Sequence, residues 1–187
     1  LRQFFPRKRI LILTHNRPLI HDLQARYHRL TAGDAMVEWR TFMGWCQAHW
    51  PADEAAPHPI GARRRNDIIV EAWRRHLADT AVSVRMFQEE IDWLKDRLLT
   101  TRQEYLAADR AGRGFGLNEA MRGRVFDAMA DYRRVMGERG WMDWGDVPRR
   151  LWRALREGRS VPQPYDFILI DEAQFFASDG APPAVQA

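Results

Sequence analysis

The sequence predicts an α/β fold in which a partial parallel sheet of about three strands carries a large all-helical insertion. Segments of strand length lie near both ends of the chain: 8–14 and 165–170 each contain a run of four apolar residues, and 36–41 (MVEWRT) has the residue types of a strand. Between 67 and about 158, apolar residues recur instead at helical spacing. Short, fully apolar runs are typical of parallel strands covered on both faces, whereas a 3.6-residue period indicates amphipathic helices. We therefore expect strands from both ends of the chain to share one sheet.

The first two of these segments fit a β-α-β unit. Residues 8–14 (KRILILT) give the first strand, and Asn16 can cap the helix that follows. Pro18 is tolerated in the first helical turn, and Gly33 ends the helix. Residues 36–41 (MVEWRT) give the second strand, so the crossover between the two strands should be right-handed.

A short helix at 42–50 and a loop at 51–65 lead into the helical region. Five amphipathic segments are expected there, beginning near Asp67, Val84, Thr101, Asn118 and Asp143. Thr101 and Glu104 have the spacing of a capping box, in which each residue bonds the backbone of the other. The Met and Trp residues of these segments recur at helical spacing, so we expect them in the core.

These patterns divide the chain into four parts. We expect 1–60 to be the N-terminal part of the α/β domain, 61–160 to be the helical insertion, and 161–178 to hold the returning strand. Residues 179–187 (DGAPPAVQA) have the composition of a linker and are expected to be disordered. The first residue is Leu1 rather than Met, so we expect an excised segment or a processed product.

The composition is that of a globular protein without a membrane span. Hydrophobic residues make up 45% of the 187 positions and charged residues 29%, and no apolar run approaches membrane length. The single cysteine, Cys46, excludes an internal disulfide and a cysteine-based zinc site, which fits a reducing, cytoplasmic compartment. Its apolar surroundings favour a buried structural thiol over a nucleophile. The histidines have no His-Glu-x-x-His arrangement, so no histidine metal site is expected.

The chain is basic, with a net charge of +4, and only Lys8 and Lys95 among its cations are lysines. Three arginine-rich runs concentrate the positive charge, at 63–65, 74–75 and 149–159. Arginine suits phosphate contact and base stacking, although an arginine-rich composition also follows from genomic base composition. Each run alone is typical of a solvated helix face. Together the runs permit nucleic-acid binding without requiring it.

The third strand ends in two carboxylates. Residues 165–170 (YDFILI) indicate a buried strand, and Asp171 and Glu172 follow it directly. Ligands of open α/β sheets bind beyond the carboxyl ends of the strands, and phosphoryl-transfer sites need one acid to hold Mg²⁺ and a second group to orient water. The pattern therefore fits a Walker B element. It fits equally an ordinary strand followed by an acidic helix N-cap, and both interpretations stay open on this segment alone.

Four segments occur in series: 10–19 (ILILTHNRPL), 41–45 (TFMGW), the helical region, and 171–174 (DEAQ). Their order and spacing resemble those of the UvrD/Rep-like superfamily 1 DNA helicases over about residues 8 to 176. The first segment looks like motif Ia of that family, the second like its Thr-Phe-His segment that touches single-stranded DNA, and the last like its motif II. The helical region is similar to the inserted subdomain 1B, at residues 90–93, Tyr105, 112–114 and 143–146.

This resemblance implies a RecA-like sheet and ATP-driven movement on single-stranded DNA. Asp171 would hold Mg²⁺ with ATP, Glu172 would polarise the attacking water, and Gln174 would sense the γ-phosphate. The DNA path would be lined by Thr14, Asn16, Thr41, Phe42 and Trp45. Trp45 fits a core position equally well, because its neighbours are also apolar. Met43 departs from the family's His, and Phe175 from an Asp found in many members. The other domains of the parent helicase are its further expected partners.

The sequence contains no phosphate-binding loop of the form Gly-x-x-x-x-Gly-Lys-Ser/Thr, because Lys8 and Lys95 are followed by Arg9 and Asp96. We therefore expect the chain to be the part of a helicase between its P-loop and the end of motif II. Such a chain would be catalytically incomplete and would bind neither ATP nor Mg²⁺. Two alternatives stay open. One is a non-catalytic nucleic-acid-binding module of a helicase-like subunit, and the other is a helical interaction domain in which the carboxylates after the third strand cap a helix.

Overall fold

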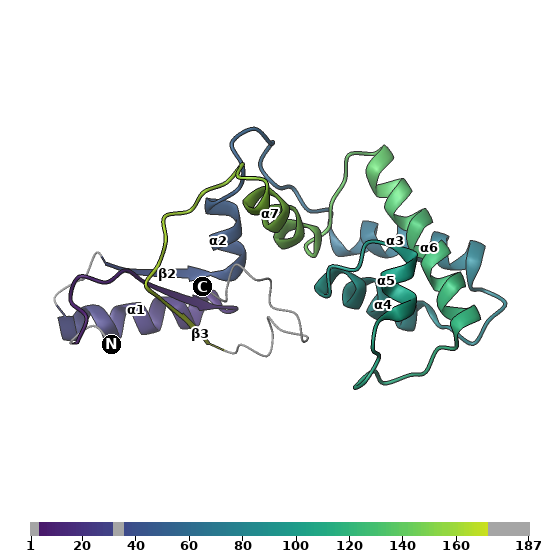
Figure 1. The fold of residues 1–187 in the computed structure, drawn as a ribbon, viewed down its shortest axis with the longest axis horizontal. Helices are drawn as coiled ribbons and strands as arrows, with labels where there is room; N and C mark the ends of the chain where they lie inside the picture. Colours follow the sequence, from purple (N-terminus) through teal and green to yellow (C-terminus); the bar gives the residue numbers. More distant parts are fainter. Residues whose placement is uncertain (1–3, 32–35, 172–187) are drawn as a thin grey trace. The chain divides into compact units, whose positions relative to one another are not determined.

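The structure, a computed structural model, describes residues 4–31 and 36–171 (Figure 1). The chain divides into two compact units. The sheet unit comprises 1–56 and 150–187, and the helical unit comprises 57–149. The helical unit is therefore one continuous stretch of sequence between the two segments of the sheet unit.

Within its described residues, the sheet unit contains three parallel strands, as the sequence predicts. β1 (Ile10–Thr14), β2 (Val37–Thr41) and β3 (Phe167–Ile170) form one sheet in the order β2-β1-β3. Ile10 pairs with Val37 on one side and with Phe167 on the other. The α/β fold class and the sharing of one sheet by strands from both ends of the chain are confirmed.

Two helices are associated with the first two strands. α1 (Arg17–Thr31) links β1 to β2 and packs on both (Figure 1). The ring centroids of Tyr27 and Trp39 are 5.6 Å apart. α2 (Phe42–Ala48) follows β2 directly. Cys46 of α2 is buried, as expected, and burial raises the pKa of its thiol to about 12. The thiol therefore stays protonated at neutral pH and is a poor nucleophile.

The surroundings of β3 differ from the prediction. We expected 165–170 to form a central strand covered on both faces, but β3 is an edge strand, with Ile168 36% and Leu169 39% exposed. β1 holds the middle position instead. Within the described part of the chain, no strand pairs with the outer edge of β3. An apolar run indicates a preference for burial, but the neighbours that cover a strand are set by tertiary structure.

The helical unit, all of whose residues are described, contains α3 (Ala62–His76), α4 (Val84–Asp96), α5 (Arg102–Ala107) and α6 (Glu119–Glu138). α6 packs on α3 and α5, and the shared core includes Phe87, Ile91, Leu94, Met129 and Tyr132. Thr101 and Glu104 form the predicted capping box at α5. The expected core role of the Met and Trp residues is confirmed for Met129, Met136 and Trp93, but it is wrong for Trp144, which is 56% exposed.

Two helix starts differ from the predictions. α3 begins at Ala62, inside the stretch 51–65 that we expected to be a loop. The reason is that Ile60 is fixed by a backbone hydrogen bond to Met142, so the chain turns into the helix immediately afterwards. α7 (Asp146–Arg156) begins three residues later than expected, because Asp143 precedes the helix and accepts a hydrogen bond from the Asp146 backbone N–H. In the described ranges, no helix is long and apolar enough to cross a membrane.

Candidate functional site

The three parallel strands bring polar residues to one edge of the sheet. Thr14 ends β1 and pairs with Thr41, which ends β2. Leu13 pairs with Ile170, and the backbone N–H of the next residue, Asp171, donates to the Leu13 carbonyl at 2.9 Å. Asp171 therefore lies beside Thr14 at the carboxyl ends of the strands. Ligands of open α/β sheets bind at this edge.

The turn after β1 is fixed by a buried hydroxyl. Thr14 is only 1% exposed, and its Oγ1 accepts a hydrogen bond from the Asn16 backbone N–H at 3.1 Å. Asn16 itself is exposed and immediately precedes α1. Burial keeps the Thr14 side chain from touching a ligand in solvent. Its hydroxyl holds the turn that presents Asn16, and the DNA contact that the resemblance implies for Thr14 is one of its backbone.

The turn after β2 is fixed in a similar way. Thr41 is the N-cap of α2, and its Oγ1 accepts from the Gly44 backbone N–H at 3.1 Å. A Cβ at position 44 would lie 2.9 Å from that Oγ1, so glycine suits the cap. Phe42 and Trp45 occupy the first turn of α2, and both are half-buried. The Trp45 ring packs against His49 with centroids 4.5 Å apart, so part of its surface is structural and part is open to solvent.

Asp171 has an unsatisfied carboxylate oxygen. Its Oδ2 is buried and has no hydrogen-bond partner among the described residues. A buried carboxylate oxygen without a donor or a cation is unfavourable. No group of three possible metal ligands occurs within 4–31 and 36–171. The Asp171 carboxylate fits Mg²⁺, which commonly takes one or two carboxylates and completes its coordination with phosphates and water. Glu172 and Gln174 lie outside the described residues.

At the opposite ends of the strands, ionic contacts hold β3 against β1. Lys8 Nζ and the Arg9 backbone N–H donate to the two oxygens of Asp166, at 2.7 and 2.8 Å. The Lys8 hydrogen bond lowers the pKa of the Asp166 carboxyl. The Arg9 guanidinium also lies over the Tyr165 ring, 4.6 Å from its centroid. These contacts hold the start of β3 beside the start of β1, and the four residues of β3 then lead to Asp171 at the carboxyl edge.

In the helical unit, a first ionic cluster surrounds Glu90. This fully buried carboxylate accepts hydrogen bonds from Tyr105 Oη at 2.8 Å and from Arg113 at 2.9 Å, and it also pairs with Arg110. Both guanidiniums lie over the ring of Trp93, 5.3 and 5.4 Å from its centroid. Burial and the Glu90 charge raise the pKa of Tyr105. Because every charge has a partner, the cluster is structural.

A second cluster surrounds Asp143. Its carboxylate accepts from Lys95 at 2.7 Å, from Tyr132 Oη at 2.6 Å and from Arg65 Nε at 2.9 Å, and Lys95 also pairs with Asp146 at 2.8 Å. Burial alone would raise the pKa of Asp143, but the cations and the phenol hold it at about 2. The sequence segments 90–93, 112–114 and 143–146 thus contribute to these two clusters. The resemblance to a known family singled out these segments, but it did not predict which charged side chains pair with one another.

No protein-family model matches the chain, and no curated protein matches it. Its functional interpretation therefore rests on the geometry of the sheet edge and on the motif resemblance.

Proposed function

We propose that the sheet unit is part of the motor core of a UvrD/Rep-like helicase, which couples ATP hydrolysis to movement on single-stranded DNA. The observation that carries the proposal is the unpaired, buried Oδ2 of Asp171 beside Thr14 at the carboxyl edge of a parallel sheet. That is the place where an α/β nucleotide-hydrolysing protein needs a carboxylate. The sheet would then be an incomplete RecA-like sheet, and the helical unit a subdomain 1B-like insertion.

The proposed chemistry assigns one task to each acidic or amide side chain. Asp171 would hold Mg²⁺, which neutralises phosphate charge when it is bound with ATP. Glu172 would orient and polarise the attacking water, and Gln174 would contact the γ-phosphate. The last two roles follow from the DEAQ resemblance alone.

The proposed DNA path crosses the turns that follow β1 and β2. Asn16 is exposed at the first turn, and Phe42 and Trp45 keep part of their surface open at the second. An aromatic side chain on such a path can stack with a base of any identity, which suits a protein that moves along DNA. Thr14 and Thr41 hold the two turns in place through their hydroxyl groups.

A second candidate function is nucleic-acid binding without catalysis. It needs only the exposed Asn16 and the partly open aromatic residues at the two strand-end turns. A purely helical interaction domain is less well supported, because the polar strand ends meet at one sheet edge.

We expect the chain alone to hydrolyse no ATP, because its sequence lacks the loop and lysine that would cradle the triphosphate. Phosphate release measured with purified protein and Mg²⁺-ATP should stay at background. Turnover that disappears in Glu172→Gln would show that the site is complete and would contradict this prediction. In a longer chain that contains a P-loop, Glu172→Gln should stop turnover and leave ATP binding intact.

The variant Phe42→Ala should weaken binding to an oligothymidine strand by about 1–3 kcal/mol, because a stacked base loses its platform. The dependence of affinity on salt should not change, since no phosphate contact is removed. Fluorescence anisotropy measures both quantities. Phe4→Ala is the matched control, because Phe4 is a highly exposed aromatic residue outside the proposed path. Equal affinities of the two variants would exclude Phe42 from the DNA path.

The same titration with Trp45→Ala distinguishes the two interpretations of Trp45. A stacking residue leaves a folded variant that binds weakly. A core residue gives a variant destabilised by about 3–5 kcal/mol, visible in thermal melts followed by circular dichroism, with unchanged affinity per folded molecule.

A further inference from the structure

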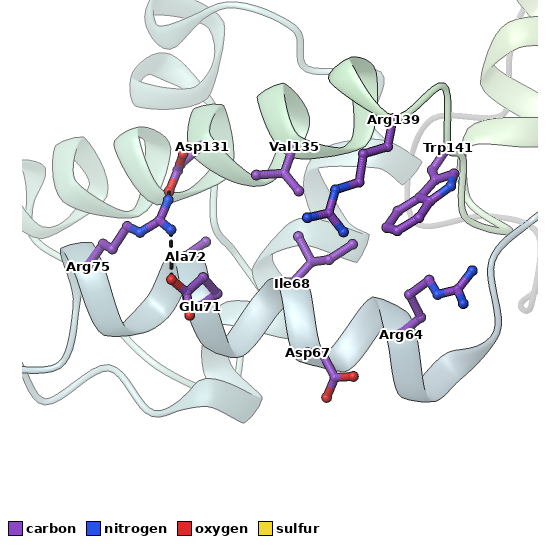
Figure 2. A pocket seen from close by; sticks show the side chains of 10 residues that line it. All are labelled: Arg64, Asp67, Ile68, Glu71, Ala72, Arg75, Asp131, Val135, Arg139 and Trp141. Atoms are coloured by element: carbon purple, nitrogen blue, oxygen red, sulfur yellow. Dashed lines mark hydrogen bonds and ion pairs between the residues drawn. The ribbon is translucent and has the colours of Figure 1, made fainter.

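The helical unit has a groove of about 450 Å³ between α3 and α6 (Figure 2). Apolar side chains of Ile68, Ala72 and Val135 line its middle. A volume of this size falls in the range of small-ligand sites, about 300–1,000 Å³. The groove is therefore large enough for one nucleotide-sized group.

One end of the groove carries two arginines without acidic partners. Arg64 of α3 and Arg139, which follows α6, flank the Trp141 ring, with their guanidinium carbons 4.9 and 4.8 Å from its centroid (Figure 2). Among the described residues, neither guanidinium forms an ion pair or a hydrogen bond. Cation–π contact restricts both side chains, so less entropy is lost when they bind an anion.

The other end of the groove is electrostatically balanced. Arg75 donates to Glu71 at 2.7 Å and to Asp131 at 2.9 Å, and Arg134 also donates to Asp131. At the Trp141 end, the exposed Asp67 lies one helical turn from Arg64 and offsets one of the two arginine charges. The available positive charge is thus concentrated at the Trp141 end, next to an apolar floor.

The neighbouring arginines are engaged elsewhere. Arg65, which belongs to the same basic run as Arg64, is bound to Asp92 and Asp143. The run 63–65 is therefore not a uniform phosphate-binding stretch. A guanidinium pair can bind a phosphate through several charge-assisted hydrogen bonds, and apolar side chains beside it can contact a base or sugar.

We propose that this groove binds one nucleotide of a single-stranded nucleic acid. Its phosphate contacts Arg64 and Arg139, and its base or sugar lies against Ile68 and Val135. The inference rests on the proposed function, because that function supplies the single-stranded nucleic acid. It concerns a different surface from the sheet edge.

The test compares two double variants by fluorescence anisotropy with an oligothymidine strand over a range of salt concentrations. Arg64→Gln/Arg139→Gln removes the groove cations. Arg74→Gln/Arg85→Gln is the matched control, because it removes the same charge from exposed positions outside the groove. The groove variant should lose about tenfold in affinity and flatten the slope of log affinity against log salt by about 0.7 relative to the control. Circular dichroism checks that both variants fold.

Any other result contradicts the groove proposal, and the results differ in what they say about the proposed function. If the wild type binds the strand and both double variants match it in affinity and slope, the groove proposal is wrong while the proposed function stands. If the wild type does not bind the strand, the proposed function fails and the groove has no strand to bind. A shift of the Trp141 indole N–H resonance with thymidine monophosphate would then assign the groove to a free nucleotide, and no shift would remove it as a nucleotide site. Both outcomes overturn the single-strand proposal.

Discussion

Asp143→Asn should destabilise the helical unit by about 3 kcal/mol, because the buried ammonium of Lys95 and the guanidinium of Arg65 lose their shared carboxylate. The figure is at the low end of the range for a broken buried pair, since Lys95 keeps Asp146 and Arg65 keeps Asp92. The Asn side chain is nearly isosteric, so the loss reports charge and hydrogen bonding rather than a cavity. Urea unfolding followed by circular dichroism measures the change. Asp79→Asn is the control, since the Asp79 carboxylate is exposed and its ion pair with Arg124 should contribute much less. Similar stabilities for the two variants would contradict the account.

The same cluster predicts a dependence on pH. The pKa of Asp143 is about 2 in the folded protein, below its ordinary value of 3.8. A carboxyl with a lowered pKa contributes its stability fully above the ordinary value and loses it as the pH falls through the folded value. The stability of the wild type should therefore fall between about pH 4 and pH 2 by more than that of Asp143→Asn. Parallel pH profiles would show that Asp143 is not held ionised.

Glu90→Gln should also cost about 3–5 kcal/mol, because Arg110 and Arg113 lose the carboxylate that both guanidiniums share. The amide oxygen can still accept from Tyr105, so the lost charge accounts for most of the effect. Glu89→Gln is a matched control on the same helix, since Glu89 is exposed and pairs only with Arg85, one helical turn away. That control should lose about 0.5 kcal/mol or less.

The Glu90 variant has a local signature as well. Arg110 and Arg113 hold the segment between α5 and α6 against Trp93. Amide hydrogen exchange in residues 109–116 should therefore quicken more than exchange in α6. Uniform acceleration across the helical unit would contradict a local role for the Glu90 contacts.

Local signals in the sequence predicted much of the fold. These signals come from residues within a few positions of one another. They predicted the β-α-β start, the capping box at Thr101 and Glu104, and the buried Met residues of α6. The edge position of β3 could not be predicted this way, because it depends on which strands pair. Arg65 is a second example: its Asp143 partner lies 78 positions away, and only the folded chain shows that this arginine is not available to a ligand.

The candidate site was predictable to a similar extent. The strands were expected to share one sheet, and parallel strands end at one edge, so a meeting of Thr14 and Asp171 follows from the expected fold. Burial of the Thr14 hydroxyl was not predictable, because it depends on how α1 packs over the turn. Of the groove cations, Arg64 lies in the arginine run 63–65, but Arg139 was missed. Arg139 and Trp141 follow α6 and belong to no motif, and their relation to Arg64 arises only from helix packing.

The most direct test of the central claim is a titration of ¹⁵N-labelled protein with an oligothymidine strand, followed by backbone amide shifts. The account predicts shifts at Asn16 and from Thr41 to Trp45, at the carboxyl ends of β1 and β2. Amides of Arg9 and Ile10, at the opposite end of β1, should stay in place. Binding that leaves 14–17 and 41–45 unchanged, or no binding at all, would contradict the claim that this sheet edge carries the DNA path.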